Sequence, residues 1–152
     1  MKKFVISILI SSIGFSQSSQ ELDIWAKDAS IKSFEMFREI LSIPNDANQL
    51  DDIELNVRWC EERFTDRGFI TKRIATPEAP LLLAEKTFSK ANETVLIYLQ
   101  IDGQPVDPSR WFQKNPYEPV LKKQNTEGHW EIIDWRNIIN YKDDWRIFAR
   151  ST

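Results

Sequence analysis

The run TVLIYL, from Thr94 to Leu99, constrains the fold of this chain more than any other stretch. It has the length of a typical strand, and polar residues do not alternate with apolar ones along it. A strand of this kind is covered on both faces, whereas a strand with one solvated face alternates. We therefore expect a layered α/β fold in which helices cover the sheet that contains this run.

Two helices are predicted before this strand. The segment from Leu22 to Ile43 places apolar residues at helical spacing and is ended by Pro44. A second segment, from Asp51 to Arg67, carries one apolar stripe and is followed by Gly68, a residue typical of helix C-termini. Together with the later strands, these helices indicate an α/β architecture.

Further strands are predicted from Phe69 to Ile74 and from Leu81 to Phe88. With Thr94–Leu99 they are expected to form a mostly parallel sheet. A proline-rich loop follows, then a hairpin in VLKKQNTEGHWEII with its turn near NTEG. The last residues, DDWRIFARST, resemble a strand and have no closing element after them.

The first residues, MKKFVISILISSIGFSQ, predict a signal peptide over residues 1–16. Two lysines begin it, an apolar stretch from Phe4 to Ile13 follows, and small residues precede the expected cleavage point after Ser16. The stretch is well short of the roughly 20 residues of a spanning helix, so no stable membrane anchor is expected. The protein is therefore expected to be exported, to the periplasm or the extracellular space.

Composition excludes several classes of function. The net charge is −3 and the basic residues are interleaved with acidic ones, which argues against a nucleic-acid-binding face. The single cysteine, Cys60, excludes an intramolecular disulfide framework. With 4 glycines in the chain there is no glycine-rich phosphate loop, and no serine stands in a G-x-S-x-G context.

Gln100 and Asp102 are the main candidate site residues, because they directly follow the apolar run. Residues i and i+2 of an extended chain point to the same side, so the two side chains are expected to project together. In open α/β sheets the C-terminal ends of strands are where ligand sites gather. The alternative is a strand cap and a turn residue that bond their own backbone, and the spacing alone does not exclude it.

The other reactive residue types are expected to be structural. His129, the single histidine, lies near the predicted hairpin turn and is expected on the surface, because a zinc site draws on several ligands. Cys60 lies on the apolar stripe of the second helix and is expected to fill the core. Four of the six tryptophans occur late, and they either pack a loop-rich region or form an aromatic platform for a sugar or peptide: Trp111, Trp130, Trp135 and Trp145.

Four segments, in order, resemble the N-terminal part of the dizinc metallopeptidases of the aminoacylase, carboxypeptidase G and carnosinase-like family (peptidase family M twenty). SFEMFREILSIPN is similar to the opening helix and its exit, and NVRWCEERFTDRGF to the end of the next helix. TVLIYLQIDGQPVDPSRWFQKNPYEPVLK resembles the metal-binding strand, which continues into H-x-D-V-x-P, a tryptophan and P-F-x-P. WRIFARST is similar to the approach to GRGxxDDKG. The resemblance covers almost all of residues 17–152.

In that family the histidine of H-x-D binds one of two zinc ions, and the aspartate orients that histidine and helps to tune the metal-bound water. Asp102 stands at the position of the aspartate, which gives it a supporting catalytic role, and Gln100 stands at that of the histidine. An amide oxygen is a harder and weaker donor for zinc than an imidazole nitrogen. Either the Gln100 carbonyl coordinates the metal while its NH2 group donates to Asp102, or the metal is bound loosely, replaced by an oxygen-preferring ion, or absent.

The resemblance also implies that residues 17–152 are a truncated N-terminal piece of an α/β catalytic domain. The remaining zinc ligands, the glutamate general base and a dimerisation domain would lie beyond Thr152, so this chain alone is expected to be inactive. The full-length protein would be a homodimeric peptidase or amidohydrolase that cleaves a peptide or an N-acyl amino acid. The alternative is a non-catalytic relative that has lost a metal ligand and binds a peptide or glycan through its Pro- and Trp-rich loop.

Overall fold

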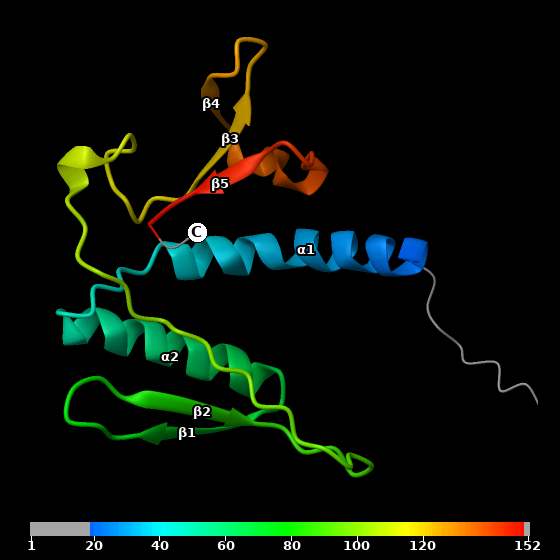
Figure 1. Ribbon diagram of the computed structural model, residues 1–152, viewed down its shortest axis with the longest axis vertical. Helices are drawn as coiled ribbons and strands as arrows, with labels where there is room; N and C mark the ends of the chain where they lie inside the picture. The colour runs from blue at the N-terminus through cyan, green and yellow to red at the C-terminus, as the bar shows by residue number, and fades with distance from the viewer. Residues whose placement is uncertain (1–18, 151–152) are drawn as a thin grey trace, which may run out of the picture. The chain divides into compact units, whose positions relative to one another are not determined.

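The computed structural model describes residues 19–150, and Figure 1 shows its ribbon. The expected signal peptide, residues 1–16, lies outside the described residues. The chain divides into two compact units, residues 1–32 and residues 33–152. Within residues 19–150, no helix combines the length and hydropathy needed to cross a membrane.

Helix α1 (Ser19–Leu41) crosses the boundary between the two units and confirms the first predicted helix. In the N-terminal unit, Lys32 Nζ lies 2.6 Å from Asp28 Oδ2, an exposed ion pair one turn apart that adds a few tenths of a kcal/mol, about 0.3–0.5. At the C-terminal end, the Ser42 hydroxyl donates to the Arg38 carbonyl at 2.8 Å. The helix stops before Pro44, which has no N–H to continue it.

Helix α2 (Leu50–Asp66) confirms the second predicted helix. Ile53 and Val57 on its apolar stripe are buried, as is Leu41 at the end of α1. After α2 the backbone turns at Gly68, whose φ of +75° lies in the left-handed region that glycine adopts without strain. Its N–H donates to the Thr65 carbonyl at 2.8 Å, which satisfies a terminal carbonyl of the helix.

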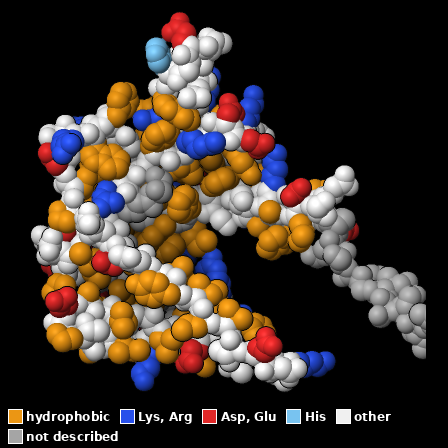
Figure 2. All heavy atoms as spheres, viewed as in Figure 1, with side chains coloured by type: hydrophobic (Ala, Val, Ile, Leu, Met, Phe, Trp, Pro, Cys, Tyr) orange, Lys and Arg blue, Asp and Glu red, His pale blue; other side chains and the backbone are white. Residues whose placement is uncertain are grey.

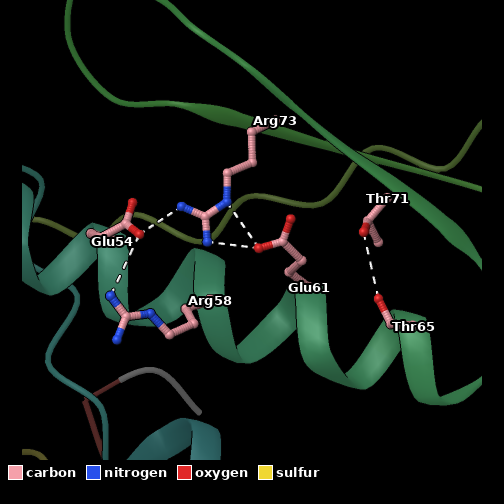
Figure 3. Close-up of polar contacts among 6 residues, drawn as sticks. All are labelled: Glu54, Arg58, Glu61, Thr65, Thr71 and Arg73. Carbon is pink, nitrogen blue, oxygen red and sulfur yellow. Dashed lines mark hydrogen bonds and ion pairs between the residues drawn. The ribbon is translucent and has the colours of Figure 1, made fainter.

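Strands β1 (Ile70–Ile74) and β2 (Leu81–Glu85) form an antiparallel hairpin that packs against α2. Arg73 on β1 links the hairpin to the helix (Figure 3), with Nη1 2.6 Å from Glu54 Oε1 and Nη2 2.7 Å from Glu61 Oε2. Hydrogen bonds, first to Glu61 and then to Glu54, raise the pKa of Arg73 above its ordinary value. The guanidinium therefore stays charged and fastens the hairpin to α2.

A second sheet has the strand order β4-β3-β5. Its strands are β3 (Val120–Gln124), β4 (Trp130–Ile133) and β5 (Arg146–Phe148), and both pairings are antiparallel. The turn between β3 and β4 confirms the predicted hairpin. In it Asn125 Oδ1 accepts the His129 N–H at 2.9 Å, and Gly128 adopts a φ of +83°.

The core of this part of the chain is aromatic and aliphatic. Leu121 on β3 is buried with Trp135 and Ile138 of the short 3-10 helix η2 (Trp135–Asn140). Partly buried hydrophobic side chains surround them: Phe34, Ile133, Tyr141, Trp145 and Ile147. Trp135 Nε1 donates to Glu35 Oε1 at 2.8 Å, so the indole is both packed and hydrogen-bonded. Trp135 and Trp145 thus follow the packing alternative.

The prediction of a mostly parallel sheet is wrong, although the coarser expectation of a mixed helix and strand fold is confirmed. All paired strands within residues 19–150 are antiparallel, and the one parallel pairing there is an isolated bridge between Asp46 and Gly103. For the β1–β2 and β3–β4 pairs the physical reason is the short connection, because a parallel pair needs a crossover of a dozen residues or more. The final strand-like segment is also better paired than expected, because β5 lies beside β3.

The run Thr94–Leu99, predicted to be a strand covered on both faces, belongs to neither sheet. Its large side chains are between 67% and 84% exposed: Val95, Leu96, Ile97, Tyr98 and Leu99. Hydrophobic side chains are accordingly plentiful on the visible face of the molecule (Figure 2). Each described strand pairs within its own sheet, and none of them pairs with the run.

Candidate functional site at the end of the apolar run

Gln100 and Asp102 lie where the sequence placed them, directly after the exposed apolar run, and both side chains are exposed. Within residues 19–150, neither side chain makes a hydrogen bond or an ion pair. The hydrogen bonds from side chain to nearby backbone that a strand cap or an Asx turn would make are therefore not formed at these two positions. Both polar groups face solvent and are available to a ligand.

The backbone around Asp102 is held from the turn after α1. Asn45 Nδ2 donates to the Ile101 carbonyl at 2.8 Å. The Gly103 N–H donates to the Asn45 carbonyl at 2.7 Å, and the Ala47 N–H donates to the Gly103 carbonyl at 2.8 Å. Three hydrogen bonds thus join two segments more than fifty residues apart in sequence, on both sides of Asp102. We call this set of contacts the Asn45 clamp.

The clamp is itself held by α2. Asn56, which is only 2% exposed, donates through Nδ2 to the Pro44 carbonyl at 2.6 Å and to the Asp52 carbonyl at 2.8 Å. The Pro44–Asn45 turn is therefore fixed to the helix by a buried side chain. Because a buried amide left without a partner costs about 1–3 kcal/mol, these bonds resist rearrangement.

Sequence reasoning did not find the clamp. Asn45 follows a proline at the exit of α1, where Asn is common in turns, and nothing in its local sequence indicates a partner near residue 102. The contact depends on how α1, α2 and the apolar run are arranged in space. Asn56 carried one local signal, since a polar residue on the apolar stripe of a helix must find a hydrogen-bond partner.

The described residues do not make a zinc site by themselves. Gln100 and Asp102 offer one amide and one carboxylate, and no group of three or more His, Cys, Asp or Glu side chains gathers within residues 19–150. A catalytic zinc site uses three protein ligands in its simplest form. Any metal held here would need further donors.

His129 lies on the surface, as expected, whereas Cys60 is only partly buried and does not belong to the core. His129 lies exposed at the β3–β4 turn, 3.6 Å from the carboxylate of Glu127. Cys60 is half-buried on α2, and burial raises the pKa of its thiol. A thiol with a raised pKa is a poor nucleophile at neutral pH, because the thiolate is the reactive form.

A buried cation on β3 is a second feature that the sequence did not indicate. Lys122 is 4% exposed, and its Nζ lies 4.3 Å from the ring centroid of Phe148 and 4.5 Å from that of Phe112. No carboxylate of residues 19–150 pairs with it. Desolvation lowers the pKa of Lys122, while the two ring faces attract the ammonium.

Comparisons with protein-family models, with curated proteins and with solved structures find no match for this chain.

Proposed function

We propose that residues 17–152 are the N-terminal part of an exported, metal-dependent peptidase or amidohydrolase, in which Gln100 and Asp102 mark one edge of the metal site. The observation that carries this proposal is the pairing of two features in one segment. An uncharged apolar run, Val95–Leu99, lies exposed without strand partners, and it ends in two unpaired polar side chains on a backbone that the Asn45 clamp fixes.

The exposed run supports the proposal because its chemistry is that of a central strand. Five neighbouring large apolar side chains do not remain in water in a finished sheet. Strands on both edges and layers on both faces would cover them, and residues 19–150 supply neither. We infer that further residues of the same protein supply these strands, together with the missing metal ligands.

Gln100 would present its carbonyl oxygen to the metal. Asp102 would accept a hydrogen bond from the Gln100 NH2 group and so orient that side chain. The substrate would be a peptide or an N-acyl amino acid, cleaved by a metal-activated water. The described donors are too few for a zinc site, so the remaining metal ligands would come from other residues of the complete protein.

The test compares the protein expressed from the uninterrupted reading frame with its Gln100→His variant. Bound zinc is measured by elemental analysis, and hydrolysis is measured on a panel of dipeptides and N-acyl amino acids. We expect metal and activity in the unmutated protein and tighter zinc binding in Gln100→His. An unmutated protein without metal or activity, in which Gln100→His restores both, would instead identify a degenerate relative.

That relative is the second candidate: a non-catalytic protein that binds a peptide or glycan. Two observations favour it, the glutamine at position 100 and the 81% exposure of Phe112 in the Pro- and Trp-rich loop. An exposed aromatic ring is a common contact for sugars and peptides. Substantial hydrolysis by the unmutated protein would eliminate this candidate, and Phe112→Ala should abolish ligand binding if it holds.

A further inference from the structure

We infer that Asn45 is a positioning residue for the end of the apolar run, which carries Gln100 and Asp102. The inference rests on the proposed function for the meaning of the site, but its geometry stands on this structure alone. Residue 102 is held on both sides, through the Ile101 carbonyl and through both backbone groups of Gly103. Movement of this backbone would turn both candidate side chains.

The side chain of Asn45 is buried, and one hydrogen bond orients it. It is 7% exposed, and its Nδ2 donates to the Ile101 carbonyl at 2.8 Å, so its amide orientation is defined by that bond. Its Oδ1 is buried and has no hydrogen-bond partner within residues 19–150. An acceptor left in this state is retained only where the other contacts of the residue outweigh the penalty.

Gly103 fits against Asn45 so closely that a larger residue would disturb the clamp. A Cβ at position 103 would lie 3.0 Å from Asn45 Oδ1 and 3.2 Å from its Nδ2. The backbone of Gly103 is outside the left-handed region, so alanine there would suffer from this contact and not from its own conformation. The close approach of the Asn45 side chain thus favours glycine at position 103.

These contacts make a double-mutant cycle informative. Gly103→Ala should push the Asn45 side chain back by a few tenths of an ångström and weaken its bond to Ile101, whereas Asn45→Ala removes that bond by truncation. Once Asn45 is alanine, the three atoms nearest to a Cβ at position 103 are gone, since all three belong to the Asn45 side-chain amide. The two substitutions should therefore be strongly non-additive, because they remove the same interaction.

The experiment measures amide hydrogen exchange and amide chemical shifts in the 15N-labelled chain. We expect Asn45→Ala to speed exchange of the Gly103 N–H about 3- to 10-fold, the effect of one lost hydrogen bond, and to shift the amides of residues 100–103. Gly103→Ala should do the same alone and add little to Asn45→Ala. Asn45→Asp keeps the shape and removes the donor, so it should resemble Asn45→Ala.

Asn48→Ala is the matched control, because Asn48 is exposed in the same turn and its side chain makes no hydrogen bond to residues 100–103. The inference is overturned if Asn45→Ala changes exchange no more than this control. It is also overturned if the effect spreads evenly over the chain, or if the two substitutions are additive. If Asn45→Ala does not fold, the comparison of Asn45→Asp with Gly103→Ala decides in the same way.

A zinc titration of the Gln100→His variant, made in the protein expressed from the uninterrupted reading frame, separates this inference from the proposed function. Asn45→Ala in that background should weaken zinc binding and change the response of the Asp102 amide to zinc. Absence of zinc binding in that variant counts against the metal site, whereas the exchange data still decide the clamp. An unaltered zinc affinity with an altered Gly103 amide would refute the positioning role.

Discussion

Replacing Leu96 by alanine tests whether the apolar run lacks partners in this chain. Leu96 is 84% exposed, whereas Leu121 in the core is 1% exposed. Truncating a fully buried leucine costs about 2–5 kcal/mol. Because only a small fraction of Leu96 is buried, we expect Leu96→Ala to change the free energy of unfolding by less than about 0.5 kcal/mol. Leu121→Ala is the matched control and should cost about 2–5 kcal/mol.

Urea denaturation, followed by tryptophan fluorescence at low protein concentration, measures both changes. Low concentration is needed because an exposed, uncharged run of high strand propensity promotes association between copies. A cost above about 1 kcal/mol for Leu96→Ala would refute the reasoning, because it would mean that the run is packed in this chain. In a longer protein that covers the run, the same substitution should cost about 2–5 kcal/mol.

Three further predictions test other parts of the structure. Desolvation lowers the pKa of Lys122, so between its folded and unfolded pKa values the unfolded chain binds more protons and the free energy of unfolding rises with pH. Lys122→Met should remove this rise towards pH 10.5. Denaturation curves with the same pH dependence in the variant would contradict this prediction. Arg73→Met removes two ion pairs and should lower the melting temperature and speed hydrogen exchange of the β1–β2 amides. Lys72→Met, on the same strand, should do neither. Equal effects of the two substitutions would mean that the Arg73 ion pairs do not stabilise the hairpin. Burial raises the pKa of Cys60, so its alkylation by iodoacetamide at pH 8 should be slower than that of free cysteine. An equal rate would show an accessible thiolate.

The two helices and the β3–β4 hairpin were predictable because their signals are local. Apolar residues repeat at helical spacing up to Pro44 and Gly68, and Gly128 lies in the turn between β3 and β4. The position of Gln100 and Asp102 after the apolar run was equally local. These features depend only on neighbouring residues, which the order of the chain specifies.

Strand partners and the surroundings of the site were not predictable in the same way. The apolar composition of Val95–Leu99 predicts that the run needs strand partners and covering layers on both faces. It does not predict whether residues 19–150 provide them. The contact between Asn45 and Ile101 spans more than fifty residues, and the burial of Lys122 between two rings depends on the packing of a distant loop. Both follow from tertiary structure, and neither leaves a pattern in the local sequence.

The central claim is that Gln100 and Asp102 belong to a metal-dependent hydrolase whose sheet continues beyond these residues. The most direct measurement is the genomic sequence downstream of the codon for Thr152. The account predicts an open reading frame that continues into a stretch similar to the end of GRGxxDDKG and then supplies the glutamate general base. A stop codon at this point in intact genomic sequence would contradict it.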